Sequence, residues 1–181
     1  MKSNWYIEES FFSKKEVNDI NKIVQNKFEP NLKDIPADTS KICEVKVIFA
    51  KHLKKYLNII DDKINEINTL HFGFNMTNYF DYDWINHNTY KAKDKGEYDW
   101  HIDLNDNKMY DLKFTCLVNV SEQPYTGGDF YLMLSKMFNL KPFHTPGSLL
   151  IFPSFFLHKV DPVLSGERKT LIFFKKGPLW R

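Results

Sequence analysis

The chain has 181 residues, of which 43% are hydrophobic and 16% aromatic, so it is long enough to bury the core of one domain. Its 25 basic and 23 acidic residues leave a formal net charge of +2, which excludes a strong overall field for nucleic acid or an anionic membrane. No apolar run approaches the ~20 residues of a membrane span, the N-terminus lacks the apolar segment of a signal peptide, and Cys43 and Cys116 have no metal-ligand spacing. We therefore expect a cytoplasmic protein that is not secreted, has reduced cysteines and has no membrane partner.

Helices are predicted in the first third of the chain. Residues 5–12 are typical of a short extended segment, and Ser13 followed by Glu16 has the spacing of a capping box. Apolar residues then recur at helical spacing to about Lys27. Residues 28–39 are polar and contain two prolines, residues 42–49 alternate as a strand does, and a second helical stripe covers residues 53–67.

The rest of the chain has the alternating apolar pattern and frequent turn sequences of a β protein. Apolar residues at 70, 72, 74 and 76 alternate with polar or small ones, which is the period of a half-buried strand. Short strands follow, separated by turn sequences at 94–96, 105–107, 127–129, 145–147 and 165–166. This order predicts an α+β, mainly β, fold: helices at about 13–67 buttress a double-sheet jelly roll at about 69–176, in a single domain of residues 1–181.

Two histidines and one carboxylate are the candidate metal ligands. In a strand, His101 and Asp103 project from the same face because side chains alternate. His158 follows the predicted strand 147–152 and could supply a third ligand from a neighbouring strand. Such a set is the facial triad that holds non-haem Fe(II) with open coordination positions. Taken singly, an H-x-D pair can lie on a strand surface and His158 can be a core histidine.

A cation follows on the next predicted strand, residues 168–174. Arg168 and Thr170 share one face of that strand and can point into one cavity. The planar fork of an arginine suits a carboxylate, so Arg168 is the candidate partner for a dicarboxylate co-substrate.

Together these motifs resemble the Fe(II)- and 2-oxoglutarate-dependent dioxygenases, and among them the prolyl 4-hydroxylase-like branch with its compact bacterial and viral members. The motifs are His101-x-Asp103, Gly127-Gly128-Asp129-Phe130, Pro146 to Ser154, and His158 followed by Arg168. The resemblance implies a double-stranded β-helix, Fe(II) on His101, Asp103 and His158, and Arg168 on the distal carboxylate of 2-oxoglutarate. Tyr90, which loosely matches a Tyr-x-x-Gly-x-x-Tyr pattern of the family, is implied as a further contact to 2-oxoglutarate.

The resemblance also implies peptidyl-proline 4-hydroxylation, with O2 consumed, succinate and CO2 released, and ascorbate as a reductant. The partner would be a proline-containing protein or peptide, in the host cytoplasm if the chain is viral. Tyr98 and Trp100, which flank His101, are candidate substrate contacts. The sequence predicts no oligomeric state.

Two alternatives stay open. The same chemistry could act on a nucleobase, a free amino acid or another small molecule, although Lys169 and Thr170 stand where nucleic-acid demethylases show further arginines. A cupin-like module could instead bind metal or sugar without oxidation. A halogenase is excluded by Asp103, because halogenases lack that carboxylate.

Overall fold

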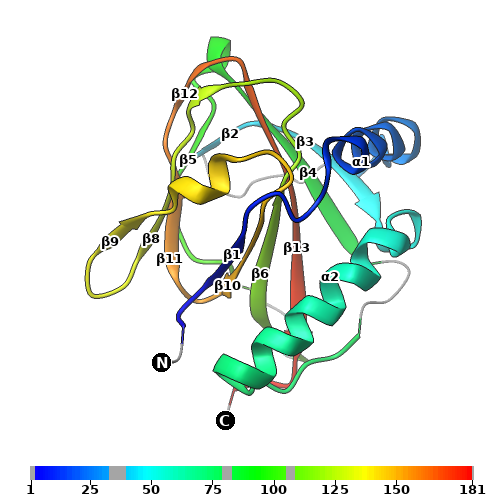
Figure 1. Cartoon of the computed structure of the whole chain (residues 1–181), viewed down its shortest axis with the longest axis vertical. Helices are drawn as coiled ribbons and strands as arrows, with labels where there is room; N and C mark the ends of the chain where they lie inside the picture. Colours follow the sequence, from blue (N-terminus) through cyan, green and yellow to red (C-terminus); the bar gives the residue numbers. More distant parts are fainter. Residues whose placement is uncertain (1–2, 33–39, 79–82, 105–108, 181) are drawn as a thin grey trace.

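The computed structural model describes residues 3–32, 40–78, 83–104 and 109–180 (Figure 1). Within these residues the helices are α1 (Lys14–Lys27) and α2 (Lys54–Ile67), with short 3-10 turns η1 (Ala50–His52), η3 (Ala92–Asp94) and η4 (Lys141–His144) and a π-turn η2 (Asn68–Phe72). The strands are β1 (Tyr6–Glu8), β2 (Lys41–Ile42), β3 (Glu44–Phe49), β4 (Trp84–Lys91), β5 (Glu97–His101), β6 (Asp111–Asn119), β7 (Thr126–Gly127), β8 (Phe130–Met133), β9 (Met137–Asn139), β10 (Leu149–Pro153), β11 (Leu157–Val160), β12 (Val163–Ser165) and β13 (Glu167–Gly177).

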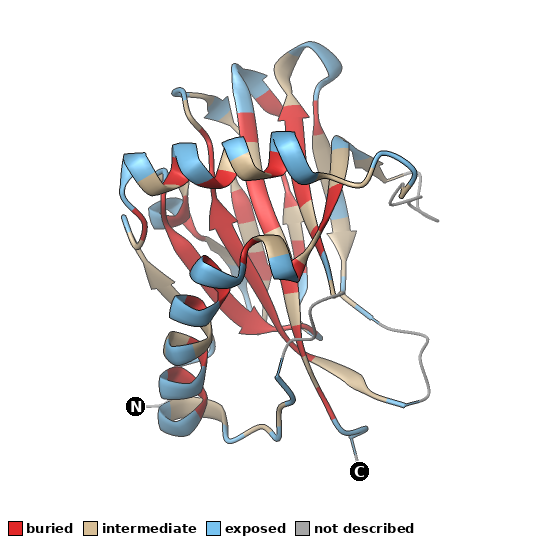
Figure 2. Cartoon of the chain, turned by 90° about the vertical axis from the view of Figure 1, so that its right-hand side faces the viewer, coloured by how far each residue is buried: buried red, intermediate tan, exposed pale blue. Residues whose placement is uncertain are grey.

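Two antiparallel sheets form the body of the described chain. The larger sheet has the strand order β1-β10-β6-β13-β4-β3, and the smaller one has the order β2-β5-β11-β8-β9. A short third ladder joins β12 to β7. The helices lie on the outer face of the larger sheet, as Figures 1 and 2 show. The predicted α+β jelly roll with two buttressing helices is therefore confirmed.

Both faces of the larger sheet are buried in its middle. Successive residues of a strand point to opposite faces. One set packs against the helices: Cys116, Val118, Leu149, Ile151, Leu171 and Phe173. The other set packs with residues of the smaller sheet: Leu117, Leu150 and Phe152 with Phe130, Leu132 and Val160. Strand β10 is consequently buried over its whole length, which is why it reads as a continuous apolar run in the sequence.

The two predicted helices form as expected. The Ser13 hydroxyl accepts a hydrogen bond from the Glu16 backbone N–H, and the Glu16 carboxylate accepts one from the Ser13 N–H at 2.8 Å, which confirms the capping box. Helix α2 buries one apolar stripe: Tyr56, Leu57, Ile60, Ile64 and Ile67. Its opposite side faces solvent, as the pale blue outer surfaces of the helices in Figure 2 show.

The prediction of a strand at residues 70–76 is wrong. The chain continues from α2 into the π-turn Asn68–Phe72, and Gly73 ends it with a φ of 75°. The Asn68 side-chain amide then donates to the Phe74 carbonyl and accepts from the Phe74 N–H, both at 2.8 Å. This side chain satisfies the backbone groups that a sheet ladder would otherwise pair. Phe72 and Phe74 still pack against the core, so their alternation reflects burial without a strand.

Other expectations have mixed outcomes. The extended segment at 5–12 contains β1, and residues 42–49 contain β3, as predicted. Part of the predicted loop 28–39 and the predicted turn 105–107 lie outside the described residues. Neither Cys43 nor Cys116 is joined in a disulfide. Among the described residues, no helix combines the length and apolarity needed to span a bilayer.

Candidate metal and co-substrate site

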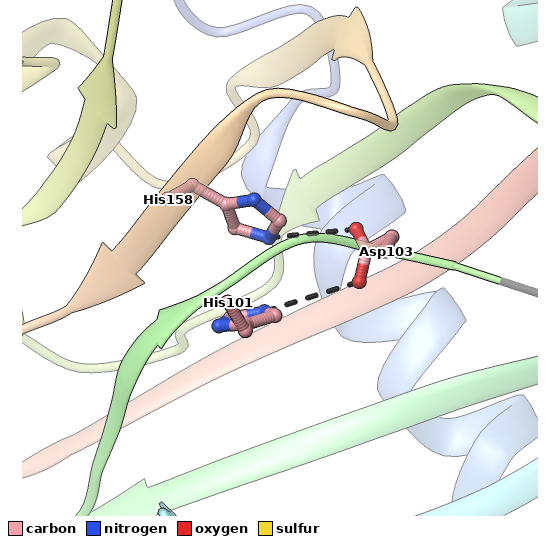
Figure 3. Close-up of side chains that lie close together, drawn as sticks. All are labelled: His101, Asp103 and His158. Atoms are coloured by element: carbon pink, nitrogen blue, oxygen red, sulfur yellow. Dashed lines mark ion pairs between the residues drawn. The ribbon is translucent and has the colours of Figure 1, made fainter.

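The three predicted metal ligands converge between the sheets. His101 is the last residue of β5, His158 lies on β11, and the two are direct partners in the antiparallel β5–β11 ladder. Asp103 follows β5, and its backbone N–H donates to the Ser154 carbonyl at 3.1 Å. One ligand atom from each of the three residues can be chosen so that all lie within 4.8 Å of one another (Figure 3).

Backbone carbonyls orient both imidazoles. Nδ1 of His101 lies 2.7 Å from the Asp99 carbonyl oxygen, and Nδ1 of His158 lies 2.8 Å from that of Phe156. A carbonyl only accepts, so each Nδ1 carries the proton and each Nε2 presents its lone pair. These Nε2 atoms face the Asp103 carboxylate, at 3.9 Å from Oδ1 for His101 and 3.4 Å from Oδ2 for His158. The rings are thus set in the tautomer that a metal needs.

A hydroxyl pair supports the carboxylate. The Thr115 hydroxyl, fully buried on β6, donates to Asp103 Oδ2 at 2.6 Å. The Ser154 hydroxyl lies 3.1 Å from the Thr115 hydroxyl oxygen. Thr115 was not among the predicted site residues. Its only sequence signal is a polar residue inside the apolar strand 114–118, which does not say which face it occupies.

Burial determines the protonation of the metal-free ligands. Desolvation, together with the neighbouring His158, lowers the pKa of His101 to about 4, and desolvation lowers the pKa of His158 to about 4. Burial also raises the pKa of Asp103, against the opposing effect of the Thr115 hydrogen bond. Neutral imidazoles beside a desolvated carboxylate are poised to bind a cation, which would compensate the buried negative charge.

The three side chains line a cavity of about 200 Å³ that extends toward Arg168. Arg168 is only 1% exposed, and its Nη2 has no hydrogen-bond partner. No carboxylate of the described residues forms an ion pair with it, and its guanidinium lies 5.3 Å from the Tyr90 ring and 5.7 Å from the Phe143 ring. A buried, unpaired guanidinium costs several kcal/mol, so this end of the cavity favours a carboxylate.

Register explains which residues surround Arg168. It pairs with Tyr90 across the β13–β4 ladder, and Thr170 pairs with Asn88. The Thr170 hydroxyl and the Asn88 Oδ1 are both buried without a partner, and both residues line the cavity. The predicted inward face of Arg168 and Thr170 is therefore observed. Asn88 was not predicted, although its position two residues before Tyr90 places it on the same strand face.

Gly96, the glycine of the loosely matched Tyr-x-x-Gly-x-x-Tyr pattern, has a steric role beside the buried Tyr90. Burial raises the pKa of the Tyr90 hydroxyl well above its usual range, and the Cys43 thiol hydrogen-bonds to that hydroxyl. Gly96 approaches the backbone of β4 so closely that a Cβ there would lie 2.8 Å from the Tyr90 Cα. Only glycine fits this approach, which holds Tyr90 at the cavity wall.

The two predicted substrate contacts differ in position. Tyr98 lines the cavity and stacks on His101, with ring centroids 3.4 Å apart and an interplanar angle of 16°. Trp100 does not line the cavity, and the Lys159 ammonium lies 5.3 Å from its ring. Lys41, which was not predicted, also lines the cavity, 5.4 Å from the Tyr98 ring. Lys41 lies on β2, a strand of two residues, which is too short to show a periodic pattern in the sequence.

Comparison with known proteins places this geometry in a family. The model of the 2OG-Fe(II) oxygenase superfamily matches residues 85–176, which is just over half of the chain. A PKHD-type hydroxylase from Synechococcus sp. (strain CC9605) is 39% identical over 81 residues, which cover 41% of this chain and 34% of that relative. The chain thus matches about a third of the length of this curated relative.

Solved structures share the fold at low identity. A prolyl-4-hydroxylase from Pseudomonas putida superposes with a TM-score of 0.71 at 18% identity, covering 97% of this chain and 94% of the other. The viral collagen prolyl hydroxylase of Paramecium Bursaria Chlorella virus-1, solved with 2OG, gives 0.72 at 18% identity and 97% coverage of both chains. A prolyl hydroxylase from Trichoplax adhaerens, solved with a hypoxia inducible factor peptide, gives 0.71 at 18% identity and covers 95% of this chain and 83% of its own.

The matched segment contains the two histidines, the carboxylate and the buried arginine that line one cavity. By this match the chain belongs to the 2OG-Fe(II) oxygenase superfamily.

Proposed function

We propose that this protein is a Fe(II)- and 2-oxoglutarate-dependent dioxygenase that hydroxylates a prolyl residue of a protein or peptide. One observation carries the proposal: three metal-ligating side chains and a buried, unpaired Arg168 line the same cavity. The donor set, two imidazole nitrogens and one carboxylate, suits Fe(II) with positions left open. A cupin-like module that only binds metal has no need for an unpaired guanidinium at the end of its cavity.

The chain's own residues would divide the work by position. His101, Asp103 and His158 would hold the metal, with Thr115 fixing the carboxylate. Arg168 would pair with the distal carboxylate of 2-oxoglutarate, because its free Nη2 is buried at the far end of the cavity. Thr170 and Tyr90 would hydrogen-bond the same group, since they lie beside Arg168 on the paired strands β13 and β4.

Bound Fe(II), with 2-oxoglutarate and O2, supplies the oxidation that converts a C–H bond to an alcohol with release of succinate and CO2. Apolar side chains exclude water from the reaction chamber: Leu117, Phe130, Val160 and Ile172 line it with the ligands. Tyr98, stacked on His101, would keep that imidazole in place and shield one side of the chamber.

Proline as the target is supported by the relatives. The superposed proteins from Pseudomonas putida and Trichoplax adhaerens are prolyl hydroxylases, and the second one was solved with a peptide. Asn86 and Phe174 line both the metal cavity and a second hollow of about 420 Å³, which gives room beside the cavity for the rest of a peptide.

The test separates binding from turnover. Under anaerobic conditions, the wild type should bind Mn(II) and then 2-oxoglutarate, and His158→Ala should bind neither tightly. With Fe(II), 2-oxoglutarate, ascorbate and O2, proline-containing peptides should gain one oxygen atom as 2-oxoglutarate is converted to succinate and CO2. Absence of metal binding, or of succinate with every peptide, would reject the proposal, and removal of methyl groups from alkylated DNA would reject proline as the target.

A further inference from the structure

A second hollow opens beside the metal cavity, and we call it the mouth groove. It has a volume of about 420 Å³, and its walls include Asp83, Trp84, Leu104, Tyr110, Phe174 and Lys176. Asn86 and Phe174 line both hollows, so the groove adjoins the metal cavity. Leu104, which lines the groove, directly follows the metal-ligand candidate Asp103, so one wall of the groove lies close to the metal site.

The groove contains large apolar side chains that are exposed to solvent and lie outside the hydrophobic core. Trp84 is 58% exposed and Leu104 is 71% exposed, although both are large and apolar. Trp84 is the first residue of β4, a strand whose later residues are mostly buried. Exposed apolar side chains gathered in a concave surface are characteristic of a binding site, because a ligand removes them from water.

Size indicates what part of a substrate the groove receives. The metal cavity, at about 200 Å³, is below the roughly 300–1,000 Å³ of pockets that enclose a drug-sized ligand. It suits 2-oxoglutarate and one reacting side chain. The body of a larger substrate must therefore stay outside, and the mouth groove is a hollow that adjoins the chamber.

Charge favours a polypeptide over a nucleic acid. Among the described residues that line the groove, the charged groups are one carboxylate, Asp83, and one ammonium, Lys176. They form an ion pair at 2.5 Å, and the ammonium also lies 5.0 Å from the Tyr110 ring. A phosphate backbone needs a surplus of cations, which this neutral, aromatic groove does not offer.

We propose that the mouth groove binds the polypeptide segment next to the residue that is hydroxylated, with an apolar or aromatic side chain packed on Trp84. This inference rests on the proposed function and adds a determinant of substrate choice to it. Contacts made away from the reacting bond orient the target over the metal, so the groove would act on substrate affinity and leave 2-oxoglutarate binding unchanged.

Peptide selection tests the groove directly. A displayed library with a central proline and random flanks is selected on wild-type protein loaded with Mn(II) and 2-oxoglutarate without O2. Aromatic or aliphatic residues should be enriched within a few positions of the proline. For the best peptide, Trp84→Ala should raise Kd about tenfold or more, whereas Trp84→Phe should largely restore binding. Met137→Ala, an exposed apolar residue on β9 of the other sheet, is the matched control and should leave Kd unchanged.

Each other result has a defined meaning. If Trp84→Ala binds the selected peptides as the wild type does, the groove is not the recognition site. The polypeptide assignment is overturned if single-stranded oligonucleotides displace the peptides and lose affinity in Trp84→Ala. A wild-type dimer that dissociates in Trp84→Ala, with no peptide enrichment, would make the groove a contact between copies. The affinity for 2-oxoglutarate is measured in parallel, so a failure of the proposed function is seen separately from a failure of the groove.

Discussion

His158 lies directly opposite His101 in the antiparallel ladder of β11 and β5, although the two are far apart in the sequence. Their ring centroids are 4.1 Å apart, and the Asp103 carboxylate faces both Nε2 atoms. Because a one-residue slip would turn a strand's side chains to the opposite face, the register of this ladder places the candidate metal site. The site therefore depends on the sheet as a whole, and its supporting residues can be tested without removing a ligand.

Thr115→Val should weaken metal binding while the fold is kept. The substitution removes the hydroxyl that donates to Asp103 Oδ2 at 2.6 Å but retains the volume of the side chain. Loss of such a supporting hydrogen bond typically lowers metal affinity about 10- to 100-fold. Titration with Mn(II) measures the effect. Thr89→Val, a buried threonine on β4 away from the cavity, is the control, and equal affinities in the two variants would contradict the role of Thr115.

Arg168→Gln should raise the Kd for 2-oxoglutarate at least about 30-fold, because truncating one partner of a buried charge pair costs 2 kcal/mol or more. Binding of Mn(II) should be unaffected, since the guanidinium does not touch the ligands. Lys169→Gln is the matched control: its ammonium points away and pairs with Glu122 at 2.7 Å. An unchanged Kd in Arg168→Gln, measured by calorimetry without O2, would remove Arg168 from the co-substrate site.

Gly96→Ala should disturb the Tyr90 wall of the cavity. The new Cβ would lie 2.7 Å from the Lys91 backbone nitrogen and 2.8 Å from the Tyr90 Cα, and neither backbone atom can move without shifting β4. Such overpacking costs about 1–3 kcal/mol of unfolding free energy, which denaturant titration measures. The affinity for 2-oxoglutarate should fall as well. In Gly73→Ala no atom lies within 4 Å of the new Cβ, but the φ of 75° strains it, so it should lose stability and keep the affinity.

Local patterns predicted the parts of this fold that local interactions determine. The capping box of α1 lies within four residues, and it formed with both hydrogen bonds. The inward face of β13 was predicted from alternation alone, and Arg168 and Thr170 both line the cavity. The strand predicted at 70–76 failed because Asn68 binds the backbone of Phe74 through its side chain, which hydrophobic alternation does not reveal.

The missed site residues depend on register between distant strands. Asn88, Thr115 and Lys41 reach the cavity region through strands β4, β6 and β2, and a polar residue in a strand does not disclose its partners. Asn88 faces Thr170 only because β4 pairs with β13 in one particular register. The three ligands were easier to find because their residue types and spacing are chemically specific.

His87 should make the stability of the metal-free protein depend on pH. It is 6% exposed on β4, and its Nε2 donates to the Asn21 side-chain oxygen at 2.8 Å. Burial is the largest cause that lowers the pKa of His87 to about 4; the positive charges of Lys169 and Lys46 act in the same direction, and Glu122 opposes them. The folded state therefore holds the neutral imidazole, whereas the unfolded chain takes up a proton near its ordinary pKa of about 6.5.

The direction in which the unfolding free energy changes with pH follows from this difference in proton uptake. The contribution of neutral His87 is fully present above pH 6.5 and is lost as the pH falls through the window from 6.5 to about 4. Between pH 7.5 and 5.5 the loss amounts to about 1 kcal/mol. His87→Gln keeps a donor for Asn21 and removes the titration, so its unfolding free energy should fall about 1 kcal/mol less over that range than the wild type's. His101 and His158 titrate alike in both proteins, so the difference between the two curves isolates His87. Parallel curves from urea titrations at the two pH values would show that His87 is protonated without cost in the folded state.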